Sequence, residues 1–218
     1  MKALFSLDFD DTLVDTNGTL RLAQETICSK LHIDPALFER AYQEIKKSNG
    51  VFNPEKHLRM VMGGQKNLKG GIQAYEDAFA KRMPHAVFTD VGSSIKKLKM
   101  LGVVAIFSKG DADWQRKKIR WSGLDADVDY VMAVEEKSAK HIGKMASAAP
   151  MKPDIIFHFD DKPKEFVGFR EYAKKTGVRV YLIRIARTEL IRKVNADLAD
   201  AEFDTLANAV EHVKGILK

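Results

Sequence analysis

The 218-residue sequence is poor in cysteine and has no long apolar run. Its single cysteine, Cys28, excludes an internal disulfide and a cysteine-based zinc site. The six histidines are scattered without zinc-ligand spacing. No segment approaches about 18 apolar residues, and the apolar run before Asp8 is too short for a signal peptide or a membrane span. We therefore expect a soluble protein of the reducing cytoplasm.

Internal repeats and low-complexity segments are also missing. The hydrophobic fraction of 45% is that of an ordinary globular protein. A chain of 218 residues can bury the core of one large domain, or of a core with a small appendage.

The net charge of +6 raises the question of nucleic-acid binding. The basic residues are interleaved with acids along the chain, so we interpret most of them as a solvated surface that could help attract a small anionic substrate. Trp114 and Trp121 could stack on bases, but their seven-residue spacing places both on one helix face and favours core packing. We therefore do not expect a nucleic-acid partner.

The most informative feature is a pair of carboxylates after the first apolar run. Residues 2–8 predict a buried parallel strand, and Asp8 and Asp10 face the same side if the extended conformation continues through Phe9. Ligands bind at the carboxyl ends of such strands. Two like charges this close favour a divalent cation such as Mg²⁺. The alternative is that Asp10, Asp11 and Thr12 only cap a following helix.

The segment Asp8-Phe9-Asp10-Asp11-Thr12-Leu13 resembles the first signature of the haloacid dehalogenase (HAD) superfamily of phosphohydrolases. Three further segments resemble its later signatures, in family order: Ser108 with Lys109 after an apolar run, Lys137 after a short apolar stretch, and Asp160-Asp161 after another apolar run. Alone, each has an ordinary alternative as a turn residue, a surface lysine with Lys140 as a competitor, or a helix cap. Their order and context favour the resemblance.

The resemblance implies a phosphatase that works through an aspartyl-phosphate. Asp8 is then the nucleophile, and Asp10 protonates the leaving alcohol and later deprotonates water, which requires a raised pKa. Ser108, Lys109 and Lys137 are expected to hold the phosphoryl oxygens. A halide needs no proton to leave, whereas an alkoxide does, so Asp10 favours phosphate esters. The expected substrate is a small phosphorylated metabolite.

The resemblance also implies a Mg²⁺ site. Its ligands are expected to be Asp8, the backbone carbonyl of Asp10, and the Asp160-Asp161 pair, with Asp161 slightly preferred over Asp160 as the principal ligand. Glu165, four residues later, takes a second acidic place, where its length would let it act through a water molecule. A phosphomutase using the same residues, and a non-catalytic protein that binds phosphate or nucleic acid, are the alternatives.

Residues 17–84 have a helical pattern and no convincing strand. Leu20, Ala23, Ile27 and Leu31 recur at helical spacing, and Leu37, Ala41 and Ile45 repeat it after Asp34-Pro35. Breaks are expected at the Gly63-Gly64 and Gly70-Gly71 pairs. In the resembled superfamily a helical cap is often inserted at this place. Lys66 or Gln65 could touch the substrate from a cap loop, or belong to a plain turn.

The remaining sequence, 1–16 and 85–218, predicts an α/β core with a doubly wound parallel sheet. After the first strand, strands are expected at 103–107, 130–134, 155–159 and 178–183, and helices at 91–100, 114–121, 139–148, 165–175 and 205–217. His158 is expected to point away from the site.

Overall fold

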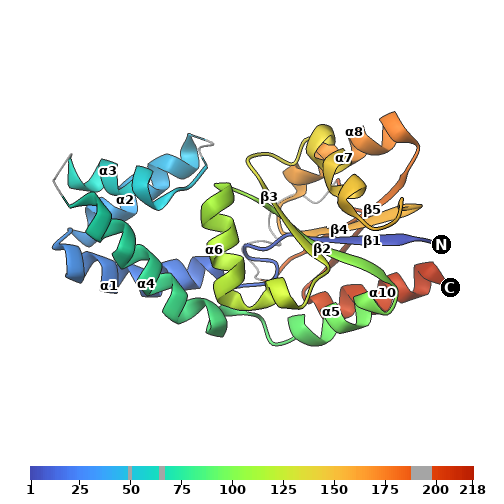
Figure 1. Cartoon of the computed structure of the whole chain (residues 1–218), viewed down its shortest axis with the longest axis horizontal. Coiled ribbons are helices and arrows are strands. Elements are labelled where there is room, and N and C mark those ends of the chain that lie inside the picture. The colour runs from blue at the N-terminus through green and yellow to red at the C-terminus, as the bar shows by residue number, and fades with distance from the viewer. Residues whose placement is uncertain (49–50, 64–66, 188–197) are drawn as a thin grey trace.

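The computed structural model describes residues 1–48, 51–63, 67–187 and 198–218. Within them, a sheet of six parallel strands runs in the order β3-β2-β1-β4-β5-β6 (Figure 1). The strands are β1 (Ala3–Leu7), β2 (Gly102–Lys109), β3 (Tyr130–Val134), β4 (Ile155–Asp160), β5 (Arg179–Ile185) and β6 (Ala201–Phe203). The predicted doubly wound parallel sheet is confirmed.

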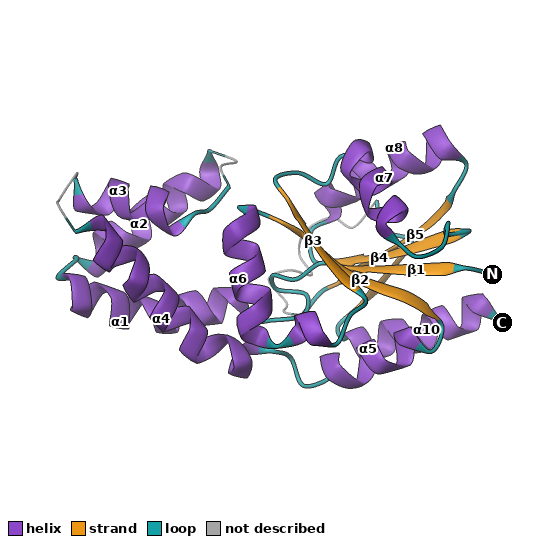
Figure 2. Cartoon of the chain, in the orientation of Figure 1, coloured by secondary structure: helices purple, strands orange, loops and turns teal. Residues whose placement is uncertain are grey.

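Helices cover both faces of this sheet (Figure 2). On one side lie α5 (Val91–Lys99) and α10 (Leu206–Leu217), and on the other α7 (Ala139–Ala148) and α8 (Phe166–Thr176). The helix α6 (Ala112–Ser122) stands between the sheet and the helices of the first third of the chain (Figure 1). Two short 3-10 helices, η1 (Leu124–Ala126) and η2 (Pro163–Glu165), complete the core.

The central strand β1 shows why a continuous apolar run forms in the middle of the sheet. All five of its residues are buried. Leu4 packs in the cluster that includes Met145 of α7, whereas Phe5 packs in the cluster that includes Leu98 of α5. Alternate side chains of a strand point to opposite faces, so a strand covered on both faces needs apolar residues throughout.

The first third of the chain is helical, as predicted. Its helices are α1 (Thr16–Leu31), α2 (Pro35–Lys47), α3 (Pro54–Met62) and α4 (Leu68–Ala86), which pack together beside the sheet (Figure 1). The expected inward position of Leu37 is wrong, because Leu37 is exposed and the neighbouring Phe38 is buried.

The expected break at Gly70-Gly71 is also wrong, because both residues lie in α4. A Cβ at Gly71 would come within 2.9 Å of the Leu58 side chain of α3. Glycine therefore lets α3 and α4 approach closely instead of ending a helix. The same helix α4 continues through Pro84 to Ala86, two residues past the expected end of the helical block.

In the core, the bounds of the predicted strands differ from those of the structure by at most two residues. The strand β2 extends to Lys109, so Ser108 lies within it. The strand β6 was not expected, since its three residues are too few for a recognisable alternation. Among the described residues, no helix is both long and apolar enough to cross a membrane.

Candidate functional site

The carboxyl ends of β1, β2 and β4 meet at a cavity of about 350 Å³. The sheet side contributes mostly charged lining residues: Asp8, Asp10, Asp11, Lys109, Lys137, Asp160, Asp161, Lys162, Lys164 and Glu165. The helices α1, α2, α4 and α6, with the loop before α3, contribute the apolar and aromatic lining residues, together with several polar ones: Leu20, Tyr42, Val51, Phe52, Phe79 and Trp114, and Thr16, Asn17, Lys46, Gln115 and Lys118. A ligand in this cavity would contact mostly charges on the sheet side and both apolar and polar side chains on the helix side.

Asp8 is held by both its backbone and its carboxylate. Its N–H donates to the carbonyl of Phe159 in β4 at 2.8 Å, and Lys137 Nζ donates to its Oδ1 at 2.7 Å. Burial raises the pKa of Asp8 well above its ordinary value, Lys137 opposes this rise, and Asp160 adds to it. Positive charge beside Asp8 therefore favours its ionised form, and burial disfavours it.

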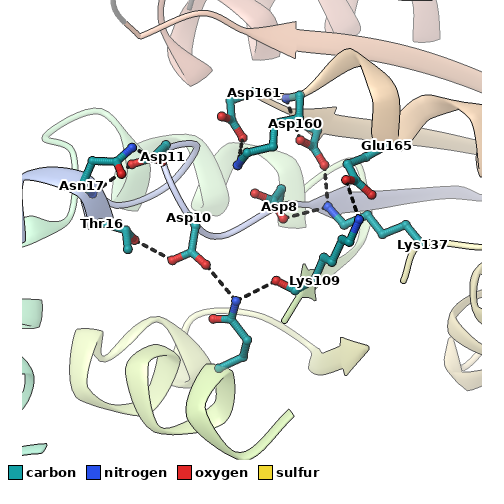
Figure 3. Close-up of polar contacts among 12 residues, drawn as sticks. Asp8, Asp10, Asp11, Thr16, Asn17, Lys109, Lys137, Asp160, Asp161 and Glu165 are labelled. Atoms are coloured by element: carbon teal, nitrogen blue, oxygen red, sulfur yellow. Dashed lines mark hydrogen bonds and ion pairs between the residues drawn. The ribbon is translucent and has the colours of Figure 1, made fainter. Parts of the chain in front are cut away.

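Three carboxylates are close enough to share a metal ion. Of the described residues, Asp8, Asp160 and Asp161 each offer an oxygen atom, and these atoms lie within 4.8 Å of one another (Figure 3). Hard carboxylate oxygens are the donors that suit Mg²⁺, so this group fits the expected ion. The carboxylates of Asp10 and Glu165 lie outside the group.

The two members of the Asp160-Asp161 pair have different surroundings. One oxygen of Asp160 accepts from Lys137 Nζ at 2.5 Å and lies 3.2 Å from His158 Nε2, and the other accepts the Lys162 N–H at 2.8 Å. Asp161 has a single ion pair among the described residues, to Lys162 Nζ at 3.1 Å. Asp161 therefore has fewer partners within the protein than Asp160.

The pKa directions of this pair follow from the same contacts. Burial raises the pKa of Asp160, but the charge of Lys137 outweighs it and leaves the pKa well below its ordinary value. Burial raises the pKa of Asp161 to about 7 against the charge of Lys162. Within this pair, Asp161 thus carries the carboxylate whose charge is less compensated by the protein itself.

His158 lies next to this group, which corrects the expectation that it points away. It is two residues before Asp160 in β4, so both side chains point to the same side of the sheet. Its ring stacks on Phe169 at 4.0 Å between centroids, and its Nδ1 lies 3.0 Å from the Ser6 hydroxyl. Burial, with the nearby charge of Lys137, lowers the pKa of His158 to about 4. A neutral His158 therefore helps to fix Asp160.

Asp10 turns away from the three-carboxylate group (Figure 3). Its carboxylate accepts from Thr16 Oγ1 at 2.5 Å, from Gln115 Nε2 at 2.8 Å and from Lys118 Nζ at 2.5 Å. Burial favours the protonated form, but the charge and hydrogen bond of Lys118 prevail and lower the pKa of Asp10. The expected raised pKa is therefore wrong for this arrangement.

Sequence reasoning missed these three partners of Asp10. Gln115 and Lys118 stand three residues apart on α6, so they share one helix face, and Thr16 opens α1. The only available signal is that two long polar side chains at this spacing follow directly after the second signature.

The turn after β1 combines the two interpretations of its acids. Asp11 has a left-handed backbone with φ of 61°, which aspartate tolerates better than most residues. Its carboxylate accepts from the N–H of Asn17 at 3.2 Å and from its Nδ2 at 2.6 Å. The N-cap of α1 is Asp15, which accepts from the Gly18 N–H. Acids of this turn therefore do stabilise a helix start, while Asp8 and Asp10 remain at the cavity.

The remaining predicted residues have mixed positions. Ser108 is buried next to the cavity-lining Lys109 but is not itself among the lining residues, and its Oγ has no hydrogen-bond partner among the described residues. Lys109 and Glu165 both line the cavity but pair with each other, with Lys109 Nζ 2.8 Å from Glu165 Oε1. Lys66 and Gln65 lie outside the described residues.

The apolar side of the cavity is built from aromatic rings. Trp114 is buried and packs edge-on against Phe79 at 5.1 Å and against Trp121 at 5.5 Å between centroids. The predicted core packing of the two tryptophans is confirmed. Tyr42 lines the same side, and Lys46 Nζ lies 5.2 Å from the centre of its ring.

No family model and no curated protein matches the sequence. Solved structures match over nearly the whole chain. A protein described as a haloacid dehalogenase-like hydrolase from Burkholderia xenovorans has a TM-score of 0.80 at 17% identity, covering 100% of this chain and 99% of its own. The HAD-hydrolase YfnB from Bacillus subtilis, whose structure is bound to magnesium, has a TM-score of 0.71 at 15% identity, with 100% and 99% covered.

The L-2-haloacid dehalogenase from Xanthobacter autotrophicus has a TM-score of 0.66 at 13% identity, covering 99% of this chain and 100% of its own. These identities are low, but the match spans the sheet and the helices beside it. The chain therefore has the fold of the haloacid dehalogenase-like hydrolases.

Proposed function

We propose that the protein is a Mg²⁺-dependent phosphatase that hydrolyses a small phosphate monoester through an aspartyl-phosphate on Asp8. The observation that carries the proposal is the meeting of two unlike acids at one cavity. Asp8 is paired with Lys137 and belongs to the group that could hold a metal, while Asp10 lines the same cavity and has its own partners. One acid can attack while the other transfers a proton.

In the first step, an Asp8 oxygen attacks phosphorus and the bond to the leaving oxygen breaks. The leaving oxygen takes a proton from Asp10 and departs as an alcohol. In the second step, a water molecule gives a proton to the Asp10 carboxylate, and the oxygen of this water attacks phosphorus. The bond to Asp8 then breaks, which releases inorganic phosphate and restores both acids.

The other residues would position the phosphoryl group and neutralise the negative charge of the site. Asp8 and Asp161, with Asp160, would hold Mg²⁺, which supplies positive charge against the carboxylates and the phosphoryl oxygens. Lys137, bonded to Asp8 and Asp160, keeps a second positive charge at the same place. The unpartnered hydroxyl of Ser108 is a candidate donor to a phosphoryl oxygen.

Asp10 also separates phosphatase from dehalogenase chemistry, since one similar structure is a haloacid dehalogenase. A halide leaves without a proton, so a dehalogenase has no use for an acid two residues after its nucleophile. Here that acid is present and lines the cavity. A phosphomutase would use the same groups and differ only in returning the phosphoryl group to the substrate.

The test is hydrolysis of p-nitrophenyl phosphate with and without Mg²⁺. We expect Mg²⁺-dependent activity that Asp8→Asn abolishes and Asp10→Asn lowers by roughly 10²–10⁴, the usual contribution of acid–base catalysis. The matched control is Asp113→Asn, because Asp113 is 89% exposed on α6. Hydrolysis undiminished in Asp8→Asn, or chloride release from 2-chloropropionate in place of phosphate release, would contradict the proposal.

A further inference from the structure

Lys162 lies directly beside the three carboxylates, immediately after Asp161. Its Nζ is 3.1 Å from Asp161 Oδ1, and its backbone N–H donates to Asp160 Oδ1 at 2.8 Å. The backbone bond fixes where the side chain starts, and the ion pair fixes where it ends. Lys162 is therefore held beside the three carboxylates by two contacts, although no role for it is predicted from the sequence.

The two lysines at this group divide the carboxylates between them. Lys137 Nζ contacts Asp8 and Asp160, and no ion pair joins it to Asp161 among the described residues. Lys162 is the cation that pairs with Asp161. Three carboxylates thus face two ammonium groups, and Asp161 depends on Lys162 for its compensation.

The two lysines also differ in how freely they can leave. The side chain of Lys137 is 0% exposed, whereas that of Lys162 is 46% exposed. Lys162 can therefore turn its ammonium group into water when another cation takes its place, while Lys137 is enclosed. A divalent ion bound to Asp161 would meet the Lys162 charge at short range, where like charges repel strongly.

We propose that Lys162 is an internal counter-cation that holds Asp161 in the metal-free protein and competes with Mg²⁺ for it. Metal binding then requires Lys162 to leave Asp161, so this lysine weakens the affinity for the ion and keeps the metal-free carboxylate group stable. The inference rests on the Mg²⁺ site of the proposed function. It adds that the site carries its own competitor.

The test is calorimetric titration of the full chain with MgCl₂ alone, without substrate. We expect Lys162→Met to bind Mg²⁺ about tenfold more tightly than the unmodified chain, a change within the range of coupling between contacting charges. Lys162→Arg keeps the charge and should restore the weaker affinity. Lys164→Met is the matched control, since Lys164 lines the same cavity and has no ion pair among the described residues. Its affinity should remain unchanged.

Thermal unfolding gives a second readout that does not depend on activity. Without metal, Lys162→Met should melt at a lower temperature, because Asp161 loses its partner in a buried group. Saturating Mg²⁺ should then raise its melting temperature by more than that of the unmodified chain. Lys162→Gln removes the charge but keeps a hydrogen-bond donor, so it tests the same point if the methionine variant folds poorly.

The outcomes separate this inference from the proposed function. If Lys162→Met and Lys162→Gln bind Mg²⁺ no more tightly while Asp161→Asn abolishes binding, competition by Lys162 is wrong and the metal site stands. If affinity for inorganic phosphate falls and affinity for Mg²⁺ stays the same, Lys162 is a phosphate ligand and the inference is overturned. If neither the unmodified chain nor the variants bind Mg²⁺, both proposals fail.

Discussion

At the scale of single residues, the two acids that follow β1 are held in opposite ways. Burial favours a protonated Asp8, whereas Lys118 favours an ionised Asp10. The proposed reaction needs the reverse, an ionised nucleophile and a protonated acid. Positive charge brought to Asp8 would favour its ionised form. A looser contact between Asp10 and Lys118 would favour the protonated form of Asp10.

Lys118 is therefore expected to set the pH range in which Asp10 can donate a proton. Removing a positive charge beside a carboxylate raises its pKa, so Lys118→Met should move the alkaline limb of kcat/KM for p-nitrophenyl phosphate upward by about one pH unit. Lys117→Met is the control, because Lys117 pairs with Glu76 on α4. An alkaline limb that stays in place in Lys118→Met would rule out this coupling.

At the scale of elements, the position of Lys137 depends on a glycine in a neighbouring helix. A Cβ at Gly168 of α8 would lie 1.9 Å from the backbone oxygen of Lys137. This contact is with backbone, which cannot rotate aside, so either α8 or the segment carrying Lys137 must move. The sheet site is therefore sensitive to how closely α8 approaches it.

We expect Gly168→Ala to lower the free energy of unfolding by roughly 1–3 kcal/mol, as overpacking does, and to reduce kcat. The matched change is Gly215→Ala in α10, where nothing lies within 4 Å of the added Cβ. There the alanine should stabilise the helix by about 0.5–1 kcal/mol. Urea unfolding of both variants measures these values, and equal effects at the two glycines would contradict the steric argument.

The helices α2, α3 and α4 meet around a buried histidine. His57 contacts the Tyr75 hydroxyl through Nδ1 and lies 2.8 Å from the Phe38 carbonyl through Nε2. Burial lowers the pKa of His57, against smaller opposing effects of the Phe38 hydrogen bond and Glu39. The helical bundle thus holds this ring in its neutral form.

A pH dependence of stability follows from this histidine. Its folded pKa lies below its unfolded pKa of about 6.5, so the unfolded chain binds more protons as the pH falls below about 6.5. The contribution of His57 to stability is full above that pH and is lost progressively below it. We expect the free energy of unfolding in urea to fall less between pH 7.5 and pH 5.5 in His57→Gln than in the unmodified chain. An unchanged difference between the two pH values would show that His57 does not titrate.

Local patterns predict the elements better than the partners within the site. The bounds of β3 and α7 follow from the sequence to the residue, because an apolar run and a helical period are properties of neighbouring positions. The contact between Asp10 and Lys118 joins residues 108 positions apart. No local period carries that information, so Lys118 becomes evident only when α6 is packed against the end of β1.

At the scale of the whole molecule, the cavity is shared by two parts of the chain with different chemistry. The residues proposed for catalysis come from the sheet, and the apolar side comes mainly from the helices beside it. Sequence motifs predict the residues on the sheet side of the cavity, because these residues follow strands in a set order. The second part has no motif, since any aromatic residue of suitable size can line a cavity, and the substrate is therefore harder to predict than the reaction.

This division predicts that the two sides affect different kinetic constants. Phe52 lines the cavity, and its ring lies 5.5 Å from that of Tyr42 between centroids. It is not one of the residues proposed to take part in the chemical steps. Phe52→Ala should therefore raise KM for an aryl phosphate by roughly 5–50-fold, the worth of about 1–2.3 kcal/mol of lost apolar contact, with a smaller change in kcat. Asp10→Asn should instead lower kcat, with a smaller change in KM.

The control for Phe52→Ala is Leu22→Ala, because Leu22 is 63% exposed on α1 and does not line the cavity. Melting temperatures of both variants separate lost binding from lost folding. A small polar ester, such as glycerol phosphate, should be nearly insensitive to Phe52→Ala, since it has no apolar group to place against the helices. If KM rises equally for both esters, the helices shape the charged side of the cavity as well, and the proposed division between binding and chemistry is wrong.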